Sequence, residues 1–387
     1  MIRRQLSSFD YMLLIAIVAL MAFGLMMIGS ATRANIMPSP QFDQQMILIP
    51  LGLIFFFLAA FIDYHFIARF YVAIYVVCVG LLAATLLYGY LITPDEPIFR
   101  WIIIRIGDFS VSMQPSEFAK VLMIIFLAKM IDKHGAGINN FRMLAFLGAS
   151  IALPVGLVMI QPSLSASLLL LLITLAVLFA GNVGGKNILI SMVLVAPMLV
   201  FLANDFTSDD PILVTHIFHE YQIGRVETIL NPEAADTDAR FQIERSIAAI
   251  GSGQLMGKGL HQGTITQAAR LPAAETDFII SVIGEEFGFL GLMGVLLVML
   301  FIVGKCMFVA ATAPDMLGRL IATGVAMKLA FQSFINVGVV TELLPNTGVP
   351  FPFLSYGGSS LWTSMIAVGL VVNVQMSKSK SMFETFE

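Results

Sequence analysis

The chain has 387 residues, of which 58% are hydrophobic and 12% charged, and its formal net charge is −4. Its mean hydropathy of +0.90 is far above what a soluble domain needs, so the composition excludes an ordinary soluble protein and predicts an integral membrane protein. The charges are laid out unevenly, so the net charge identifies no class of partner, and no nucleic-acid partner is expected. The two cysteines, Cys78 and Cys306, fit no disulfide, metal or redox spacing.

Ten apolar runs are long enough to cross a bilayer as helices. They lie near 11–30, 46–62, 71–92, 115–131, 143–160, 164–181, 187–204, 277–303, 318–342 and 359–375. Membrane strands would be shorter and alternating, so the predicted fold is an all-α polytopic membrane protein with ten transmembrane helices. The first run follows a basic start, as in a signal peptide, but its length predicts a retained membrane helix. The whole chain, 1–387, is expected to form a single transmembrane domain.

The Lys and Arg residues of the short connections predict the orientation of these helices. With a cytoplasmic N-terminus, eleven of them fall inside and three outside. The inner set is Arg3, Arg4, Arg69, Lys129, Lys133, Arg142, Lys186, Lys305, Arg319, Lys378 and Lys380, and the outer set is Arg33, Arg100 and Arg105. Both termini are therefore predicted to be cytoplasmic in a multi-pass protein of the cell membrane. One large extracellular loop, 205–276, then joins the seventh and eighth predicted helices.

This predicted loop contains ten acidic and five basic residues, so any phosphate recognition within it depends on individually placed cations. Its stretch FQIERSIAAIGSGQLMGKG (241–259) predicts a short amphipathic helix that ends in a glycine-rich turn. The glycines of the turn permit positive φ and close approach of the backbone to a ligand. With Lys258, such a turn can cradle a phosphate; the alternative is a simple re-entrant turn.

Asp277 lies where the polar loop runs back into an apolar helix. On helical geometry a line of small residues lies beneath it, namely Ser281, Gly284, Gly288 and Gly291. The functional interpretation is a carboxylate at the membrane boundary that holds a membrane-bound substrate above a groove. The alternative is an acidic residue favoured by the helix dipole, above an ordinary small-residue helix contact.

Ionisable residues within apolar runs are costly, so they indicate pairing or function. Glu117 and Lys120 are three residues apart just after a proline, which fits an ion pair in the first turn of a helix. At the helical rise per residue, Glu285 or Glu286 reaches nearly the same membrane depth as Lys328. We therefore predict a buried structural ion pair between these two helices, with a proton or ion pathway as the alternative.

Gln332 and Asn336 continue the polar line of Lys328 along one helix face, so this helix is predicted to face the interior of the bundle.

Several motifs resemble one known family over nearly the whole chain and in the family's order. They are RW (100–101), QPSEFAK (114–120), IAAIGSG with GKG (247–253, 257–259), TDF with GEE (276–278, 284–286), and PNTGVP with PFLSYGGSS (345–350, 352–360). These motifs are similar to those of the SEDS family, the RodA, FtsW and SpoVE proteins of bacterial wall growth.

The resemblance implies an enzyme that polymerises lipid II into β-1,4 glycan strands at the outer face of the membrane. It also implies a class B penicillin-binding protein (a transpeptidase) as partner, with other elongation or division machinery. Asp277 maps onto the family's essential carboxylate, and Trp101 and Lys258 map onto further family motifs. Trp101 taken alone would be read as an interfacial anchor. The short ends of the chain favour a RodA-like role in cell shape over an FtsW-like role in division.

Inverting transfer of a sugar from a lipid pyrophosphate needs a general base and cations for the departing pyrophosphate. Asp277 is the candidate base. The candidate residues for substrate binding are Lys258, Arg245, Arg270, Lys120, Glu117 and Trp101. A divalent cation, Mg or Mn, can replace part of the positive charge, although no ligand cluster in the sequence identifies a metal site.

One motif departs from the family pattern. Where relatives usually carry an acidic residue in a QPDLGTA-like segment, this chain has Ser163.

Two alternatives to the enzyme stay open. A lipid II flippase or transporter needs an ionisable path to both faces, whereas the polar groups gather on the predicted outer side. A non-catalytic scaffold for a wall synthase is favoured by Ser163 and disfavoured by the TDF and GKG motifs.

Overall fold

The computed structural model describes residues 9–33, 40–92, 100–106, 109–161, 163–184, 237–344, 346 and 348–384. The predicted span near 187–204 and the first part of the predicted loop, 205–236, lie outside the described residues. The count of ten helices therefore stays a prediction.

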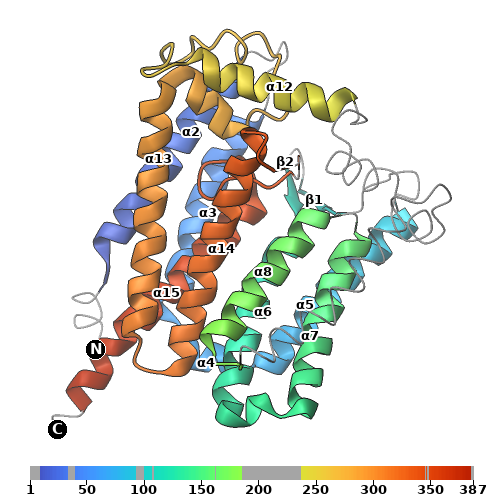
Figure 1. Ribbon diagram of the computed structural model, residues 1–387, viewed down its shortest axis with the longest axis vertical. Helices are drawn as coiled ribbons and strands as arrows, with labels where there is room; N and C mark the ends of the chain where they lie inside the picture. The colour runs from blue at the N-terminus through green and yellow to red at the C-terminus, as the bar shows by residue number, and fades with distance from the viewer. Residues whose placement is uncertain are drawn as a thin grey trace.

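Within the described residues, nine long helices form an upright bundle (Figure 1). They are α2 (Tyr11–Arg33), α3 (Gln41–Phe61), α5 (Tyr71–Ile92), α6 (Pro115–His134), α7 (Phe141–Ile160), α8 (Leu164–Ala180), α13 (Ile279–Thr312), α14 (Met316–Val340) and α15 (Gly358–Glu384). Each coincides with one of the predicted apolar runs. Seven of them are long and apolar enough to cross a membrane, whereas α8 is shorter and α6 carries several charged residues.

Four smaller elements join or cover these helices. They are α4 (Tyr64–Arg69), η1 (Gly135–Asn139), α12 (Thr237–Ser252) and a hairpin of β1 (Ile102–Ile106) with β2 (Phe109–Met113). The strands pair antiparallel from Ile102 opposite Met113 to Ile106 opposite Phe109. The all-α prediction missed this hairpin, because its isoleucine-rich and alternating segments are too short to span a membrane and pair with each other instead. The predicted amphipathic helix is confirmed as α12.

The bundle has two distinct ends. The helix α12 lies across one end, where the hairpin also lies, while α2 begins and α15 ends at the other (Figure 1). The side of the membrane on which the two termini lie stays a prediction.

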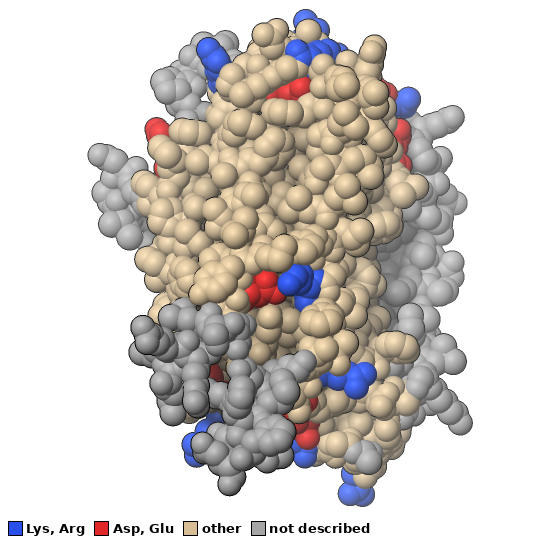
Figure 2. Space-filling view, turned by 90° about the vertical axis from the view of Figure 1, so that its left-hand side faces the viewer, with Lys and Arg blue, Asp and Glu red and all other residues tan. Residues whose placement is uncertain are grey.

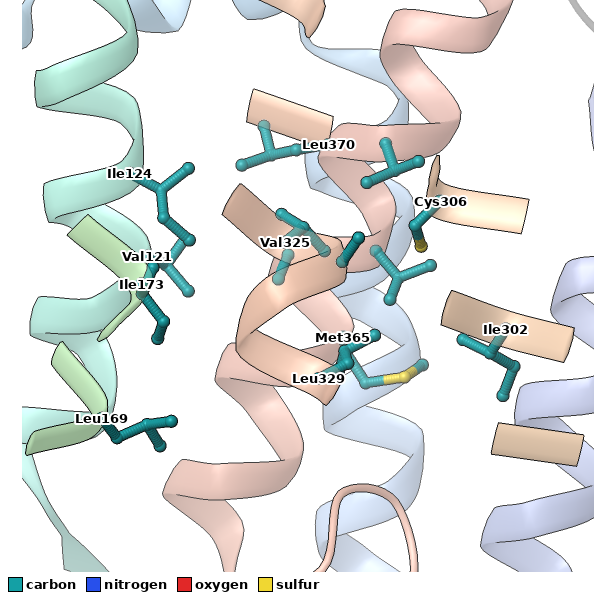
Figure 3. Close-up of a cluster of buried hydrophobic side chains, with 14 of the residues drawn as sticks. Val121, Ile124, Leu169, Ile173, Ile302, Cys306, Val325, Leu329, Met365 and Leu370 are labelled. Carbon is teal, nitrogen blue, oxygen red and sulfur yellow. The ribbon is translucent and has the colours of Figure 1, made fainter. Parts of the chain in front are cut away.

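Helices α14 and α15 form the centre of the bundle, since most of their residues are buried, whereas less than two fifths of the most apolar part of each other candidate span is buried. Figure 3 shows the packing around them, with side chains from α6, α8, α13, α14 and α15 in one apolar cluster. Small residues allow the closest crossings: a Cβ on Gly324 of α14 would lie 2.7 Å from a side-chain carbon of Ile124 in α6. A Cβ on Gly369 of α15 would lie 2.5 Å from the carbonyl oxygen of Phe56 in α3.

Candidate functional site

The candidate site lies at the α12 end of the bundle, where Asp277 immediately precedes the start of α13. Its backbone carbonyl accepts a hydrogen bond of 2.8 Å from Nδ2 of Asn336 in α14. The same amide group donates to the carbonyl of Val349 at 2.7 Å, so one buried side chain fixes both the TDF motif and the loop before α15. The side chain of Asp277 is half-buried. This end of α14 is polar and faces the interior, as predicted.

The segment that precedes α15 is an ordered, non-helical loop, as its prolines and glycines predict. The backbone N–H of Tyr356 donates to the carbonyl of Glu275 at 2.8 Å, and its hydroxyl donates to Gln44 in α3. Burial raises the pKa of Tyr356, and the nearby Glu275 carboxylate adds to this, so the hydroxyl is protonated at neutral pH. Phe353 has a φ of +65°, which is strained for an aromatic residue.

Glu117 and Lys120 form the predicted ion pair in the first turn of α6, with 2.6 Å between Nζ and Oε1. Both side chains are buried, at 4% and 1% exposure. The second carboxylate oxygen of Glu117 has no hydrogen-bond partner among the described residues. Lys328 interacts electrostatically with both residues, so this part of the bundle holds two lysine side chains and one glutamate side chain.

The predicted pairing of Glu285 or Glu286 with Lys328 is wrong. Oε1 of Glu285 lies 2.8 Å from Nζ of Lys258, Glu286 accepts a 2.5 Å hydrogen bond from Ser30, and Lys328 donates to Ser364 at 2.9 Å. The prediction assumed a straight helix running down from Asp277. The structure instead breaks α13 at Gly288, where φ is +65° and ψ is −162°, so the segment 279–287 does not continue the line of the spanning part.

The small-residue groove below Asp277 is filled by protein. A Cβ on Gly253 would lie 1.9 Å from the carbonyl oxygen of Gly284, and a Cβ on Gly257 would lie 2.2 Å from that of Glu286. Nearer to Asp277, the hydroxyl of Ser281 lies 2.7 Å from that of Ser246 in α12. The glycine line is therefore a close helix contact, which is the alternative given above, and its partner is α12 with its turn.

The glycine-rich turn also takes over hydrogen bonds that the break in α13 leaves open. In an unbroken helix the N–H groups of Phe289 and Leu290 would bond to the carbonyls of Glu285 and Glu286. The structure exchanges these partners, with Lys258 N to Glu285 O at 3.0 Å, Gly259 N to Glu286 O at 2.9 Å, Phe289 N to Gln254 O at 2.8 Å and Leu290 N to Leu255 O at 3.1 Å. Turn and helix break are thus one structural unit.

Lys258 is held inside this unit. Its ammonium group donates to Ser252 and Thr264 at 2.7 Å each and to Glu285 at 2.8 Å, which uses its three protons. Glu285 has no exposed surface and also accepts hydrogen bonds from the backbone of Ile265 and Thr266. A pyrophosphate contact by Lys258 stays a prediction, and it would have to displace one of these acceptors.

The other candidate substrate-binding residues lie on separate elements at the same end. The guanidinium of Arg245 lies 4.9 Å from the ring of Phe241 on α12, which is a cation–π contact. Arg270 is exposed in the segment after the glycine-rich turn. Trp101 is 42% exposed at the start of the hairpin, so anchoring and substrate contact both stay open. The described residues contain no group of three or more His, Cys, Asp or Glu side chains that suits a metal ion.

Sequence reasoning missed three polar residues of the apolar helices. Gln44 and Gln45 at the start of α3 accept hydrogen bonds from Tyr356 and Gly357, and Ser30 of α2 donates to Glu286. A polar residue within an apolar run was the available signal for Ser30, whereas Gln44 and Gln45 belong to the polar stretch QFDQQ (41–45) before the predicted run and gave no such signal. Ser163, which replaces the usual acidic residue, is buried at the N-cap of α8 and makes no capping hydrogen bond through its side chain.

A helical bundle with this many apolar spans, and with charged side chains buried among them, is a multi-pass membrane protein. A family model described as "Cell cycle protein", covering FtsW, RodA and SpoVE, matches residues 10–380. The chain therefore belongs to the FtsW/RodA/SpoVE family.

Curated relatives and solved structures agree with this assignment. The chain is 34% identical over 381 residues to "Probable peptidoglycan glycosyltransferase FtsW" of Trichlorobacter lovleyi, covering 96% of this chain and 94% of the relative. It is 32% identical over 367 residues to "Peptidoglycan glycosyltransferase MrdB" of Escherichia coli K12, covering 94% and 93%. Both FtsW and MrdB names therefore occur among its relatives.

Two solved structures share its fold over nearly their full length. One, described as "Structural coordination of polymerization and crosslinking by a peptidoglycan synthase complex", has a TM-score of 0.76 at 27% identity and covers 96% of this chain and 98% of its own. The other, a mutant of the rod shape determining protein RodA from Thermus thermophilus, has a TM-score of 0.66 at 25% identity, again covering 96% and 98%.

Proposed function

We propose that this protein is a peptidoglycan glycosyltransferase that polymerises lipid II into β-1,4 glycan strands. The observation that carries the proposal is the placement of Asp277. Its backbone is tied by Asn336 to the loop that precedes α15, at the polar end of a bundle that belongs to this family. The names of the curated relatives support the reaction class.

In the proposed reaction Asp277 acts as the general base. It accepts the proton of the attacking sugar hydroxyl while that oxygen forms a bond to the anomeric carbon of the second sugar. The bond from this carbon to the pyrophosphate oxygen breaks, and the lipid pyrophosphate leaves with the electron pair and inversion at carbon. Arg245 and Arg270 are proposed to stabilise the negative charge of the leaving pyrophosphate. A divalent cation, Mg or Mn, is the proposed alternative source of positive charge.

We further propose that the α12 end faces the outside of the cell membrane and that both termini are cytoplasmic. Charge placement in the short connections supports this orientation. A class B penicillin-binding protein is the proposed partner, supported by the similarity to a chain of a peptidoglycan synthase complex. The proposed setting is cell elongation, as for RodA, although the relative named FtsW is 34% identical over 381 residues and the relative named MrdB 32% over 367 residues.

The test is glycan synthesis from purified lipid II by the purified chain, alone and with a class B penicillin-binding protein. We expect polymer from the wild type and a loss of about 10²–10⁴-fold in rate for Asp277→Ala and Asp277→Asn, because either change removes the base. Glu244→Gln, on the exposed face of α12, is the matched control and should keep its rate.

Two outcomes would contradict the proposal. Full activity in both Asp277 variants would remove Asp277 from the chemistry. No polymer from folded wild-type protein, with any partner or divalent cation, would favour a flippase or a scaffold, and Ser163→Asp would then be the first variant to assay for a gain of polymer.

A further inference from the structure

We propose that the glycine-rich turn 254–260 inserts its apolar side chains into the hydrocarbon of the membrane leaflet on the α12 side. Its three apolar side chains are all exposed in the folded chain, Leu255 at 56%, Met256 at 73% and Leu260 at 36%, and Gln254 at the start of the turn is exposed as well. A turn in water would be expected to place polar residues at such positions. The three apolar side chains form an apolar tip instead.

The tip is continuous with the lipid-facing side of α13. Phe289 and Leu290, which are 55% and 51% exposed, bond through their backbone to the carbonyls of Gln254 and Leu255. Beyond the break, 11 of the 24 residues of α13 from 289 to 312 are exposed and only six are buried, as expected for a span at the edge of the bundle. The surface that meets lipid along α13 therefore runs without interruption onto the turn.

The length of α13 places this contact at the edge of the hydrocarbon layer. After the break at Gly288, the residues 289–312 continue as helix. At 1.5 Å per residue they extend about 36 Å, slightly more than the roughly 30 Å thickness of the hydrocarbon core. Phe289 and the turn bonded to it therefore lie near the boundary of that layer.

Non-helical backbone is tolerated at this depth only when the protein satisfies its hydrogen bonds. The exchange with α13 does so, because the N–H groups of Lys258 and Gly259 and the carbonyls of Gln254 and Leu255 all have partners. The N–H of Gly257 also donates, to the carbonyl of Gly253 at 2.7 Å. The turn can thus enter an apolar medium without leaving these polar groups unpaired.

Charge placement points the same way. Lys258 is the one ionisable residue of the stretch 254–260, and its ammonium group is turned inward onto Glu285. The face of the molecule on the left of Figure 1 presents mainly uncharged atoms over the central part of its upper half, below the charged atoms at the α12 end (Figure 2). Acyl chains are the occupant that matches an apolar surface continuous with a membrane span.

The experiment uses the full-length chain in vesicles of phosphatidylethanolamine and phosphatidylglycerol. In a background with Cys78→Ala and Cys306→Ala, a nitroxide label is attached at Met256→Cys, with Leu255→Cys as a second site. Leu297→Cys, 58% exposed on α13, is the lipid control, and Glu244→Cys on α12 is the water control. Only variants with the thermal unfolding midpoint of the background are compared. Collisions with oxygen, which partitions into lipid, and with a water-soluble nickel chelate are measured by electron paramagnetic resonance.

We expect the oxygen-to-nickel collision ratio at positions 255 and 256 to be several-fold above that at 244 and close to that at 297. A ratio equal to that at 244 would place the turn in water and overturn the proposal. Low collision rates with both reagents would show that protein covers the turn, and this outcome would overturn the proposal as well.

Discussion

At the scale of single residues, Glu285 is the carboxylate around which the glycine-rich turn is organised. It has no exposed surface, it pairs with Lys258, and it accepts hydrogen bonds from Thr264, Ile265 and Thr266. A buried carboxylate with this many donors stabilises one arrangement of the loop, because removal of any major donor leaves its buried negative charge without full compensation. The residue is therefore a structural anchor of the glycine-rich turn.

We predict that Glu285→Gln destabilises the protein by about 3–5 kcal/mol, because it leaves the Lys258 ammonium with no counter-charge. The measurement is the thermal unfolding midpoint of the purified protein in detergent. Glu244→Gln, which breaks an exposed pair with Arg240, is the control and should cost at most about 1 kcal/mol. Equal midpoints for the two variants would show that the buried pair contributes little.

A second residue-scale prediction concerns Asn336, whose amide holds the carbonyls of Asp277 and Val349. Asn336→Leu removes this donor from one partly buried and one buried carbonyl, at a cost of about 1–3 kcal/mol each, and loosens the position of Asp277. We expect glycan synthesis to fall at least tenfold. Thr341→Ala, which removes a hydroxyl bonded only within its own helical turn, is the control at the same end of α14.

The Asn336 experiment must distinguish a displaced Asp277 from a general loss of protein stability. Hydrogen exchange at 277–281 should rise in Asn336→Leu and stay unchanged in Thr341→Ala. Unchanged exchange together with lost activity would mean that Asn336 acts directly on substrate instead of through Asp277.

At the scale of elements, α13 is two helical segments joined at Gly288, and its upper segment is completed by another part of the chain. The backbone of 254–259 supplies the donors and acceptors that the break exposes. A break in a membrane helix is tolerated when neighbouring groups satisfy the freed backbone, and this turn is such a neighbour. Gly288 is needed both for its positive φ and for close approach to Gly257.

We predict that Gly288→Ala prevents correct folding, because the new Cβ would lie 2.3 Å from the backbone nitrogen of Gly257. Gly294→Ala in the same helix is the matched control, since among the described residues no atom beyond its chain neighbours and the adjacent helix backbone lies within 4 Å of its added Cβ. That change should be neutral or stabilise by up to about 1 kcal/mol through helix propensity. The measurement is the monodisperse fraction on gel filtration after membrane extraction, and equal yields of the two variants would contradict the assigned geometry.

At the scale of the whole molecule, both ends of the bundle are closed by polar ties between distant segments. At the end opposite α12, the hydroxyl of Tyr64 donates to Asp315 at 2.6 Å, and Asp315 also caps α14. Asn373 of α15 donates to the carbonyls of Ala60 and Ile62 at the end of α3. These contacts join α3, α4, α14 and α15 into one unit.

The Tyr64–Asp315 hydrogen bond predicts how the stability of the protein depends on pH. Burial, together with the hydrogen bond to Asp315, raises the pKa of Tyr64 above its ordinary value of 10.0. Above pH 10 the unfolded chain releases this proton while the folded chain retains it, so stability falls as pH rises, by at most about 1.4 kcal/mol per pH unit. Below pH 10 the hydroxyl is protonated in both states and contributes no slope.

The measurement is the unfolding midpoint between pH 8 and pH 11 for the wild type and for Tyr64→Phe. The variant should start lower, because it loses the hydrogen bond, and should then decline less steeply above pH 10. Parallel declines would show that Tyr64 ionises alike in the folded and unfolded chains.

The sequence by itself determined the features that depend on neighbours within a few residues. The apolar runs predicted nine helices that the structure contains, the i,i+3 spacing predicted the Glu117–Lys120 pair, and the amphipathic pattern predicted α12 with its turn. These features follow from local periodicity and from the cost of unpaired charge in an apolar helix.

Only the tertiary structure decided which partner each buried group takes. Glu285 pairs with Lys258 and not Lys328, and the small-residue line of α13 meets a turn instead of an open groove. Both outcomes follow from the break at Gly288, which changes the direction of the helix that carries Glu285. That break is stable because residues 254–259 complete its hydrogen bonds, and such a contact between separate segments leaves no periodic signal in the sequence.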